Sequence, residues 1–400
     1  MRLLILSFYY PPDLSAGSFR AAALVAALRE RAPPGTQLEV LTTLPNRYLS
    51  FVRDAARLER SPGCEIHRIA VPAHRSDILG QSRAFAHFAR AARAHAAARE
   101  YDVVYATSAR LMTAALGAWI AGRGRARLYL DLRDIFVDAI TELMPAPAAM
   151  LARPLLSRLE SWTLRRADRV NLVSPGFADY YRARYGEHSF AWFTNGIDEE
   201  FLAAAPPAPA AAVAPQRRSA PATVLYAGNV GAGQGLHEIL PALARALRGQ
   251  ARFVVIGDGG RRQALEHALT LAGVDNVELR APMSRPQLIE AYRTADVLLL
   301  HLGRQAAFER VLPSKLFEYA ALGKPILAGV GGYAARFIHE EIDNATVFAP
   351  CDVAGAVRAF ASLTLADRAR PAFVARYGRA SIARAMADDV LALANPPVVT

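Results

Sequence analysis

The chain has 400 residues, a length that favours two or three domains with buried cores. Hydrophobic residues make up 53% of it and charged residues only 21%, which excludes an intrinsically disordered chain. The formal net charge of +11 is spread without a basic tail or a dense arginine block, so nucleic acid is not an expected partner. Anionic small molecules or an anionic membrane surface fit this diffuse charge better.

The two cysteines, Cys64 and Cys351, lie far apart without a zinc-type spacing, which favours a reducing compartment. The first apolar run is too short for the core of a signal peptide. The longest apolar stretches, such as 111–121, are too short to span a bilayer. We therefore expect a cytoplasmic protein that does not cross the membrane and that can be peripheral on its inner face.

Short apolar runs alternate with amphipathic helical stretches over almost the whole chain, which is the pattern of parallel sheets with crossover helices. In chain order, the first half predicts a helix over 18–31 with Ser18 as its N-cap, and strands over 2–8, 37–42, 103–106, 127–132, 170–174 and 190–194. The second half predicts strands over 223–227, 252–256, 277–280, 297–301, 325–328 and 346–349.

These patterns divide the chain into two doubly wound α/β domains, 1–200 and 223–375. The segment 201–222 is rich in proline and alanine and is expected to be an exposed linker. The last residues, 376–400, predict a helix that packs back on the first domain. Because ligands of such sheets bind beyond the carboxyl ends of the strands, two facing domains would form a cleft around a substrate.

The loop after the first strand holds one glycine, Gly17, and an arginine, Arg20, one turn into the next helix. Gly17 would let an anion approach the amides of that helix, and Arg20 could point at the same anion. A single glycine is not a dinucleotide fingerprint, so no NAD site is predicted. The alternative is a helix cap followed by a surface arginine.

The second half opens with a loop, 226–236, that contains four glycines, and the turn 256–260 after the next strand is also rich in glycine. Glycines allow unusual backbone angles and exposed amides. Gly228, Gly257 and Asp258 therefore predict a rim that binds phosphate and sugar. The alternative is a pair of plain turns.

Lysine and arginine total 47 residues, yet Lys315 and Lys324 are the only lysines, and both lie within 311–326. An ammonium is a compact point charge and a guanidinium is a broad fork, so a tight phosphate pocket could require lysine. Pro313 and Ser314 suit the first turn of a helix that continues to 322. This helix would place Lys315 toward a diphosphate and Glu318 toward ribose hydroxyls. The alternative is an ordinary ion pair between residues three apart.

Together these segments resemble the large family-4 group of retaining GT-B glycosyltransferases, and within it the bacterial branch that makes deoxy- and amino-sugar polysaccharides such as O-antigen or capsule. The matching motifs follow family order over nearly the full chain, at 9–13 with 17–20, 131–134, 173–177, 194–198, 226–231 with 234–235, 256–259 and 313–318. The resemblance implies an α/β GT-B fold, two facing Rossmann-like domains with an interdomain cleft. It also implies transfer of a sugar from a UDP- or GDP-sugar with retention at the anomeric carbon.

By position, Glu318 corresponds to the family glutamate that holds the donor ribose, and the family's other glutamate falls on Arg310. The family's diphosphate-binding arginine and lysine fall on Asn229 and Gln234, which carry no charge. Lys315, Arg310 and Arg20 are therefore expected to supply the missing charge. The donor-binding residues implied in this way are Gly17, Arg20, Gly228, Asn229, Gln234, Gly257, Asp258, Arg310, Ser314, Lys315, Leu316 and Glu318.

The family residue near the anomeric carbon falls at Arg133 and Asp134. Asp134 would orient the acceptor or stabilise positive charge, while Arg133 could equally form a structural ion pair. With Lys315, these are the predicted catalytic residues. The resemblance implies that the leaving phosphate accepts the acceptor's proton, so no separate base is needed. The nine histidines show no ligand spacing, and neither a catalytic metal nor a cofactor is expected.

Two other functions remain open from the sequence. One is a nucleotide-sugar epimerase or hydrolase on the same scaffold, and the other is a non-catalytic nucleotide-sugar-binding protein. For a transferase of this branch, the resemblance favours a polyprenyl-diphosphate-linked acceptor.

Two segments could hold such an enzyme at an anionic membrane. The segment 78–93 carries Phe85, Phe88, Arg90 and Arg93, and the segment 150–166 carries Trp162 among four arginines. The alternative is that both helices pack on the sheet with their arginines in water.

Overall fold

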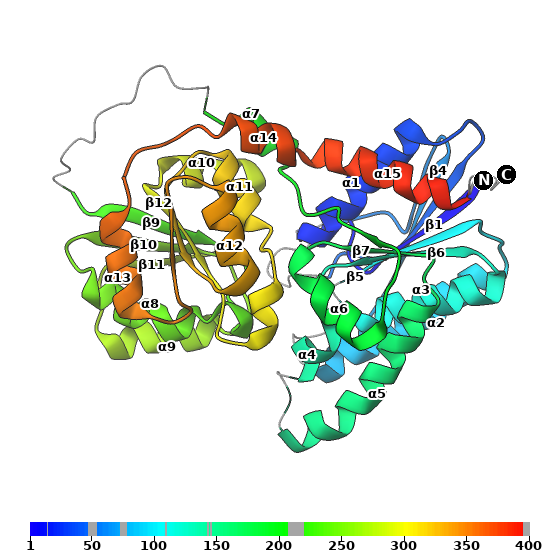
Figure 1. Ribbon diagram of the computed structural model, residues 1–400, viewed down its shortest axis with the longest axis horizontal. Coiled ribbons are helices and arrows are strands. Elements are labelled where there is room, and N and C mark those ends of the chain that lie inside the picture. Colours follow the sequence, from blue (N-terminus) through cyan, green and yellow to red (C-terminus); the bar gives the residue numbers. More distant parts are fainter. Residues whose placement is uncertain are drawn as a thin grey trace. The chain divides into compact units, whose positions relative to one another are not determined.

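The computed structural model describes residues 1–13, 15–46, 54–72, 78–108, 110–141, 144, 146–206 and 220–394, and the chain forms two compact units (Figure 1). Unit 1 is Met1–Asn195 with Arg379–Thr400, and unit 2 is Gly196–Gly378. The chain therefore changes unit at 195/196 and again at 378/379, and not across the proline- and alanine-rich segment. Residues 207–219 of the expected linker and 395–400 of the expected last helix lie outside the described residues.

Unit 1 is built on an eight-stranded sheet in the order β3-β4-β2-β1-β5-β6-β7-β8. Neighbouring strands are parallel except for β3, which is antiparallel to β4. The strands are β1 (Arg2–Ser7), β2 (Gln37–Thr43), β3 (Leu58–Ser61), β4 (Cys64–Ile69), β5 (Val103–Ser108), β6 (Arg127–Leu132), β7 (Arg169–Leu172) and β8 (Phe190–Ala191). The sequence patterns missed β3 and β4, because all four residues of β3 are exposed and their pattern lacks an apolar face.

The helices of unit 1 are α1 (Ala16–Arg31), α2 (Ile78–Ala97), α3 (Leu111–Gly124), α4 (Phe136–Thr141), α5 (Ala146–Arg165), α6 (Ala178–Tyr185) and α15 (Arg379–Ala394). Helix α15 packs on α1 over a core that includes Leu3, Leu28 and Met386. Among the described residues, three ion pairs link it to the rest of unit 1, Arg31 to Asp388 and Arg169 to Asp389 at 2.8 Å and Arg384 to Glu30 at 3.1 Å.

Unit 2 contains a fully parallel six-stranded sheet in the order β11-β10-β9-β12-β13-β14. Its strands are β9 (Ala222–Ala227), β10 (Ala251–Ile256), β11 (Val277–Arg280), β12 (Val297–His301), β13 (Ile326–Gly329) and β14 (Ala345–Phe348). Its helices are α7 (Glu199–Ala203), α8 (Leu236–Ala246), α9 (Arg262–Ala272), α10 (Arg285–Thr294), α11 (Lys315–Ala321), α12 (Gly332–Glu341), α13 (Val353–Ser362) and α14 (Pro371–Tyr377).

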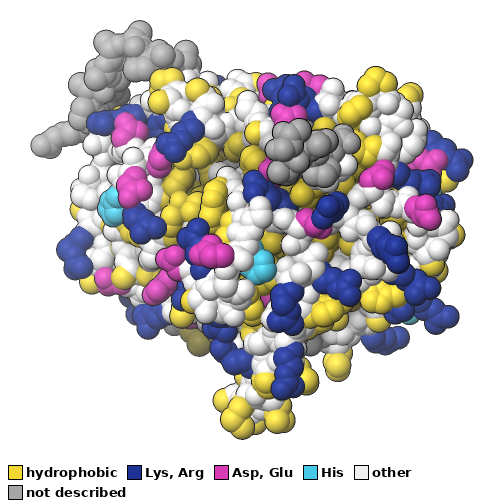
Figure 2. Space-filling view, turned by 45° about the vertical axis from the view of Figure 1, so that its right-hand side comes forward, with side chains coloured by type: hydrophobic (Ala, Val, Ile, Leu, Met, Phe, Trp, Pro, Cys, Tyr) yellow, Lys and Arg dark blue, Asp and Glu magenta, His cyan; other side chains and the backbone are white. Residues whose placement is uncertain are grey.

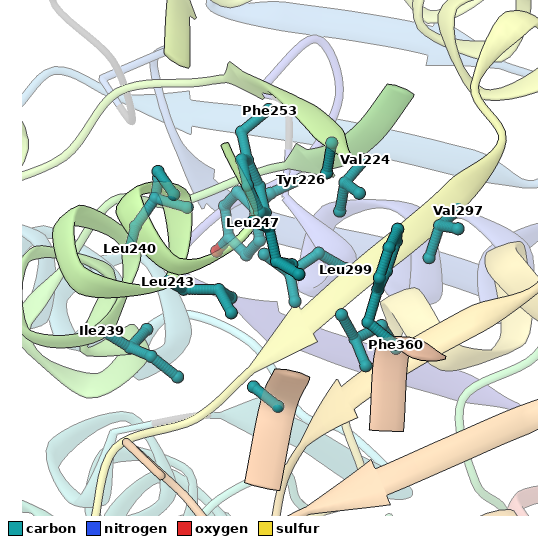
Figure 3. Packing of buried hydrophobic residues seen from close by; sticks show 14 of the residues in the cluster. Val224, Tyr226, Ile239, Leu240, Leu243, Leu247, Phe253, Val297, Leu299 and Phe360 are labelled. Carbon is teal, nitrogen blue, oxygen red and sulfur yellow. The ribbon is translucent and has the colours of Figure 1, made fainter. Parts of the chain in front are cut away.

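The core of unit 2 forms where α8 and α13 cover the central strands (Figure 3). Leu240 and Leu243 of α8 point toward Tyr226 and Phe253 of the sheet, and Phe360 of α13 lies near Leu299. Burial of large apolar side chains like these contributes about 1.5–3 kcal/mol each. This packing holds the carboxyl ends of β9, β10 and β12 side by side, where the glycine loops begin.

Candidate functional site

Lys315 lies directly on the glycine loop of unit 2. Gly228 has a φ of 138°, and a Cβ atom there would overlap the end of the Lys315 side chain. The ammonium donates a hydrogen bond to the Tyr226 hydroxyl at 3.2 Å and lies 4.7 Å from the centre of that ring. A positive charge is therefore held over the loop between β9 and α8, where an anionic ligand would meet it.

The other lysine has a structural role. Lys324 is buried, and its Nζ atom forms an ion pair with Asp367 at 2.9 Å. The clustering of the two lysines in sequence therefore combines one residue of the glycine loop with one that anchors the turn before β13.

Asn229 and Gln234 stabilise the glycine loop of unit 2 through hydrogen bonds within it. The Asn229 side-chain amide donates to Gln234 Oε1 at 2.8 Å, and the Gly231 N–H approaches the same oxygen at 3.2 Å. His301 adds to these hydrogen bonds, since its Nδ1–H donates to the Gln234 carbonyl at 2.6 Å while its Nε2 accepts from the Cys351 N–H at 3.0 Å. Burial lowers the pKa of His301, which keeps the ring neutral. His301 was missed by the sequence reasoning, although a histidine that ends an apolar strand is a signal.

Gly257 and Asp258 stabilise the glycine loops themselves. A Cβ atom at Gly257 would overlap the Gly228 carbonyl, and the Gly257 N–H donates to the Arg280 carbonyl at 3.1 Å. Asp258 accepts from the Gly259 N–H at 2.8 Å through its side chain. The Gly228 N–H is likewise committed, to the Ile256 carbonyl at 2.8 Å. The N–H groups of Gly228 and Gly257 are therefore already bonded to neighbouring strand ends, and contact of these two glycines with a donor stays a prediction.

Helix α11 begins at Lys315, with Ser314 as the residue before it. Leu316 is fully buried and its N–H donates to the Pro313 carbonyl at 3.1 Å, so its side chain has no exposed surface for a ligand. Glu318 lies one turn along α11 from Lys315 and is partly exposed, as is Arg310 at the end of the 3₁₀ turn Ala306–Arg310. Lys315, Ser314, Glu318 and Arg310 thus remain candidates for contact with a donor.

A pocket adjoins the glycine loop. It encloses about 420 Å³ of space, part of it open to solvent, and is lined by Leu302, Gly303, Arg304, Gln305, Phe308, Glu309, Gly331 and Pro350. The Gly303 N–H donates to the Gly233 carbonyl at 2.8 Å, which joins the loop after β12 to the glycine loop. The Phe308 ring packs on Gly233 so closely that a larger residue would be displaced. The pocket therefore lies directly beside the glycine loop.

Arg20 in unit 1 is a structural residue. It is 4% exposed and forms a bidentate ion pair with Asp131, both hydrogen bonds measuring 2.9 Å. Two more guanidinium N–H groups donate to the carbonyls of Thr194 and Phe193 at 2.7 Å. The geometry thus contradicts the expected contact between Arg20 and donor phosphate, because the Arg20 guanidinium already donates its hydrogen bonds to groups inside unit 1.

Asp131 is the centre of this buried network. It accepts further hydrogen bonds from Thr107 at 2.7 Å, Tyr105 at 2.9 Å and Asn171 at 2.7 Å. Burial alone would raise the pKa of Asp131, but Arg20 and these hydrogen bonds outweigh it, and the pKa is lowered. Asp131 therefore stays ionised in the centre of the sheet.

Helix α1 starts earlier than expected. Its N-cap is Ser15, whose hydroxyl accepts from the Ser18 N–H at 3.2 Å, and Ser18 itself is buried inside the first turn. This shift places Gly17 within the helix, against the Arg133 guanidinium.

The two predicted catalytic residues of unit 1 lie differently. Arg133 lines a small pocket at the carboxyl ends of β1 and β5, and burial lowers the pKa of its guanidinium. Asp134 instead accepts from the Ile135 N–H at 2.9 Å, and its carbonyl accepts from the Tyr181 hydroxyl at 3.2 Å. Arg133 is therefore placed for contact with a ligand, whereas Asp134 holds the start of α4.

One group of described residues could hold a metal ion. It consists of Glu39, His67 and His95, whose ligand atoms lie within 4.8 Å of one another. Glu39 also accepts from Tyr101 at 2.7 Å and lies 3.3 Å from Arg99. Histidines with no ligand spacing in sequence are thus brought together by β2, β4 and α2. The group lies in unit 1 and includes none of the predicted donor-binding residues.

The two segments considered for membrane contact have different surroundings. Phe88 of α2 is fully buried, Phe85 stacks on Phe8, and Arg93 covers the Trp119 ring at 4.1 Å. The expected apolar stripe of α2 therefore faces the protein. The amino-terminal end of α5, by contrast, exposes 74% of Met150 and 71% of Leu151. No helix among the described residues has the length and apolar character needed to span a bilayer.

The fold is that of GT-B glycosyltransferases. The structure is similar to that of Anabaena HepE in complex with UDP, with a TM-score of 0.65 and 15% identity over 98% of this chain and 99% of that one. It is also similar to WaaG, a glycosyltransferase involved in lipopolysaccharide biosynthesis, with a TM-score of 0.64 and 16% identity over 98% and 97% of the two chains.

Two family models locate the chain more narrowly. The Glycosyl transferase 4-like domain matches residues 17–189, and Glycosyl transferases group 1 matches residues 211–380. With both units matched, the chain belongs to the family-4 GT-B glycosyltransferases. A stretch of 100 residues is 33% identical to WcaI of Escherichia coli (strain K12), whose name assigns it to colanic acid biosynthesis; the match spans 25% of this chain and 24% of that protein.

Proposed function

We propose that the protein is a retaining, metal-independent glycosyltransferase that moves a sugar from a nucleoside diphosphate to a lipid-linked saccharide in surface polysaccharide biosynthesis. The observation that carries the proposal is the ammonium of Lys315, held on Gly228 by the Tyr226 hydroxyl. Its charge would stabilise the diphosphate as it leaves. Glu318, on the same short helix, would accept hydrogen bonds from the ribose.

The choice of donor and pathway draws on the similar proteins. HepE has been crystallised with UDP-glucose, WaaG acts in lipopolysaccharide biosynthesis, and WcaI is named for colanic acid. We infer a UDP- or GDP-sugar as the donor and a polyprenyl-diphosphate-linked saccharide as the acceptor. Nothing in this mechanism requires a base of the protein, because the leaving phosphate can take the proton of the acceptor.

A donor panel tests this function. UDP- and GDP-sugars are incubated with and without a polyprenyl-diphosphate saccharide, and the products are read by mass spectrometry. We expect a new glycosidic product only when acceptor is present, with the donor configuration retained by NMR. Release of free sugar without acceptor would identify a hydrolase, an altered nucleotide sugar would identify an epimerase, and binding without any product would identify a non-catalytic protein.

Metal independence needs its own control. EDTA should leave the transfer rate unchanged, because no Asp-x-Asp metal motif is apparent in the sequence. The double variant His67→Ala/His95→Ala removes the one group of described residues that could hold a metal in unit 1. A rate that falls with EDTA in both proteins would contradict metal-independent transfer, whereas a loss confined to the wild type would point to a structural ion.

We also propose that the tip of α5 holds the enzyme at an anionic membrane. Met150, Leu151 and Leu155 are 74%, 71% and 65% exposed, and Arg153 and Arg158 follow within the same helix. Figure 2 shows hydrophobic side chains at the end of the lowest projection, which α5 forms in Figure 1, with Lys and Arg side chains above them. Apolar side chains can enter the headgroup region while each nearby cation adds about 1 kcal/mol on an anionic surface.

Liposome flotation tests the α5 tip. The wild type should float with vesicles that contain anionic lipid, and salt should weaken the binding. The variant Met150→Ser/Leu151→Ser/Leu155→Ser should lose it, while Arg90→Glu on α2 serves as the matched control and should retain it. Equal flotation of the triple variant and the wild type would contradict the assignment to α5.

A further inference from the structure

Unit 1 contains a small basic pocket that lies outside the donor site proposed around Lys315 and Glu318, although its lining includes Gly17, predicted to bind the donor, and Arg133, predicted to be catalytic. It encloses about 300 Å³, part of it open to solvent, and among the described residues it is lined by Ser7, Phe8, Tyr9, Gly17, Thr107, Arg110, Thr113 and Arg133. Two of these residues are arginines and none is acidic. The pocket lies at the carboxyl ends of β1 and β5, where doubly wound sheets bind their ligands.

Arg133 brings a partly buried cation to this pocket. Its guanidinium rests on Gly17, where any side chain would displace it, and its buried Nε has no hydrogen-bond partner among the described residues. Its neighbour Asp131 already forms a bidentate ion pair with Arg20. Asp131 and Asp134 both act electrostatically on Arg133, but Asp131 is already paired with Arg20, so the positive charge of Arg133 is only partly offset beside Gly17.

Arg110 supplies a second guanidinium in a fixed orientation. It lies 4.7 Å from the centre of the Phe8 ring and 5.3 Å from that of Tyr9, and it donates to the Tyr9 hydroxyl at 2.9 Å. The two rings are nearly perpendicular, at 88°, and their contacts with the guanidinium limit its motion, so less conformational freedom is lost when it binds an oxyanion. The aromatic residues of the first loop therefore position an arginine at the rim of the pocket.

Thr113 adds an unused hydroxyl. Its side chain is fully buried in the first turn of α3 and lines the pocket, and its Oγ1 has no hydrogen-bond partner among the described residues. Arg110 occupies the N-cap of this 14-residue helix without a side-chain cap hydrogen bond. A buried hydroxyl without a partner costs free energy, and an oxyanion in the pocket would satisfy it.

We propose that this pocket binds a phosphate group of the acceptor, the group that joins the saccharide to its lipid. The proposal rests on the proposed function and names the chemical class of its second substrate. Two guanidinium groups, a hydroxyl and the start of a helix are the groups that recognise a tetrahedral oxyanion in proteins. We assign the acceptor's phosphate rather than the donor's because the donor site proposed in unit 2 has its own cation, Lys315, on the glycine loop.

Direct binding tests the pocket without requiring turnover. Farnesyl diphosphate, a short polyprenyl diphosphate, is titrated into the full-length protein by calorimetry and compared with farnesol. We expect farnesyl diphosphate to bind and farnesol not to bind. Arg110→Gln should weaken binding about 10- to 100-fold, in line with the loss of a charged hydrogen bond, and Thr113→Val should weaken it several-fold. Arg123→Gln, an exposed change on the same helix, is the matched control and should bind as the wild type does.

Competition identifies the source of the phosphate. UDP added in saturating amounts should leave the affinity for farnesyl diphosphate unchanged if the two anions occupy separate sites. Displacement of farnesyl diphosphate by UDP, with the same dependence on Arg110, would assign the pocket to the donor and overturn the proposal. Equal affinity of wild type and Arg110→Gln would also overturn it, provided circular dichroism shows both to be folded.

A kinetic comparison separates this proposal from the proposed function. The preference for a diphosphate-linked acceptor over the same saccharide on a phosphate-free alkyl chain is measured as a ratio of kcat/KM. Arg110→Gln should reduce that ratio about 10-fold or more, mainly through KM of the diphosphate acceptor. Transfer with an unchanged ratio would refute phosphate binding in the pocket without contradicting the proposed transferase function. Absence of all transfer would refute the proposed function, while calorimetry would still decide the pocket.

Discussion

Arg20 in unit 1 and Lys315 in unit 2 are both basic residues near a glycine that follows a strand, yet they occupy opposite environments. Arg20 is buried and donates hydrogen bonds to Asp131 and two backbone carbonyls. Lys315 instead lies on Gly228 and donates to a tyrosine hydroxyl. The difference lies in the neighbouring strands. A carboxylate on β6 reaches Arg20, and the described part of unit 2 shows no carboxylate paired with Lys315 in this way. A cation beside a glycine can thus stabilise the fold when a carboxylate pairs with it, or be available to a ligand when none does.

The largest expected effect comes from breaking the buried pair of unit 1. Asp131→Ala leaves Arg20 charged and buried without its partner, which costs about 3–5 kcal/mol. Urea denaturation should show this loss directly. The exposed pair Arg31–Asp388 provides the control, since Asp388→Ala should cost less than about 1 kcal/mol. A stability of Asp131→Ala within about 1 kcal/mol of wild type would mean that the network does not hold unit 1 together.

The corresponding change in unit 2 should affect activity rather than folding. Lys315→Ala and Glu318→Ala should each lose about 2–4 kcal/mol of transition-state stabilisation, measured as kcat/KM, with little change in melting temperature. Lys315→Arg should restore little, because its broad fork does not fit the space above Gly228. The second lysine reverses the pattern, since Lys324→Met should lower stability through the Asp367 pair and leave kcat/KM of the folded protein intact. Normal turnover by Lys315→Ala would show that Lys315 does not contribute to the donor site.

The two units also differ in how far sequence could predict them. All twelve expected strands are present within a few residues, because buried parallel strands read as continuous apolar runs bounded by turns. The polar hairpin β3–β4 escaped this pattern. The position of Lys315 followed from a local motif, whereas the fate of Arg20 depended on Asp131, 111 residues away. Long-range partners of a charge are not encoded in its neighbours, so the start of the helix at Lys315 was easier to predict than the network in unit 1.

The same limit applies to surface and hydrogen-bond partners. An alternation of phenylalanine and arginine indicated a membrane face on α2, but Phe85 and Phe88 pack against Phe8 and the stripe is internal. Glycines after strands indicated free amides, but Gly228 and Gly257 donate to neighbouring strand ends. Sequence patterns report which residues are apolar or flexible, and the fold decides what they contact.

A smaller effect should come from filling the space beneath Lys315. Gly228→Ala places a methyl group where the ammonium lies, at a φ of 138° that side chains rarely adopt. We expect a loss of about 1–3 kcal/mol in transition-state stabilisation, seen mainly as a higher KM for the donor, together with a lower melting temperature. Gly249→Ala is the control, because it has a comparable positive φ of 79° in a turn with nothing nearby to displace. It should lower stability without changing the KM. Equal KM values for both variants would mean that the position of Lys315 on Gly228 does not affect donor binding.

The smallest effect concerns a second buried carboxyl group of unit 1, which contrasts with Asp131. Burial raises the pKa of Glu160 to about 7, although the Tyr185 hydroxyl and Arg184 act in the opposite direction and Asp138 adds to the increase. Since the folded protein keeps this proton while the unfolded chain releases it, the unfolded state becomes relatively more favourable as the pH rises from about 4.5 to about 7. Asp131, whose pKa is lowered, behaves oppositely and destabilises the fold only at acid pH.

Glu160→Gln removes the titration while keeping an oxygen that can accept from Tyr185. Its stability relative to wild type should therefore increase between pH 5 and pH 8, by about 1–2 kcal/mol once structural relaxation around the ionised group is allowed for. Urea denaturation at the two pH values measures this difference, and Glu187→Gln, on the exposed loop after α6, should show none. A pH-independent difference between Glu160→Gln and wild type would mean that Glu160 ionises normally in the folded protein. Its burial would then be offset by a stronger interaction with Arg184 than the present geometry provides.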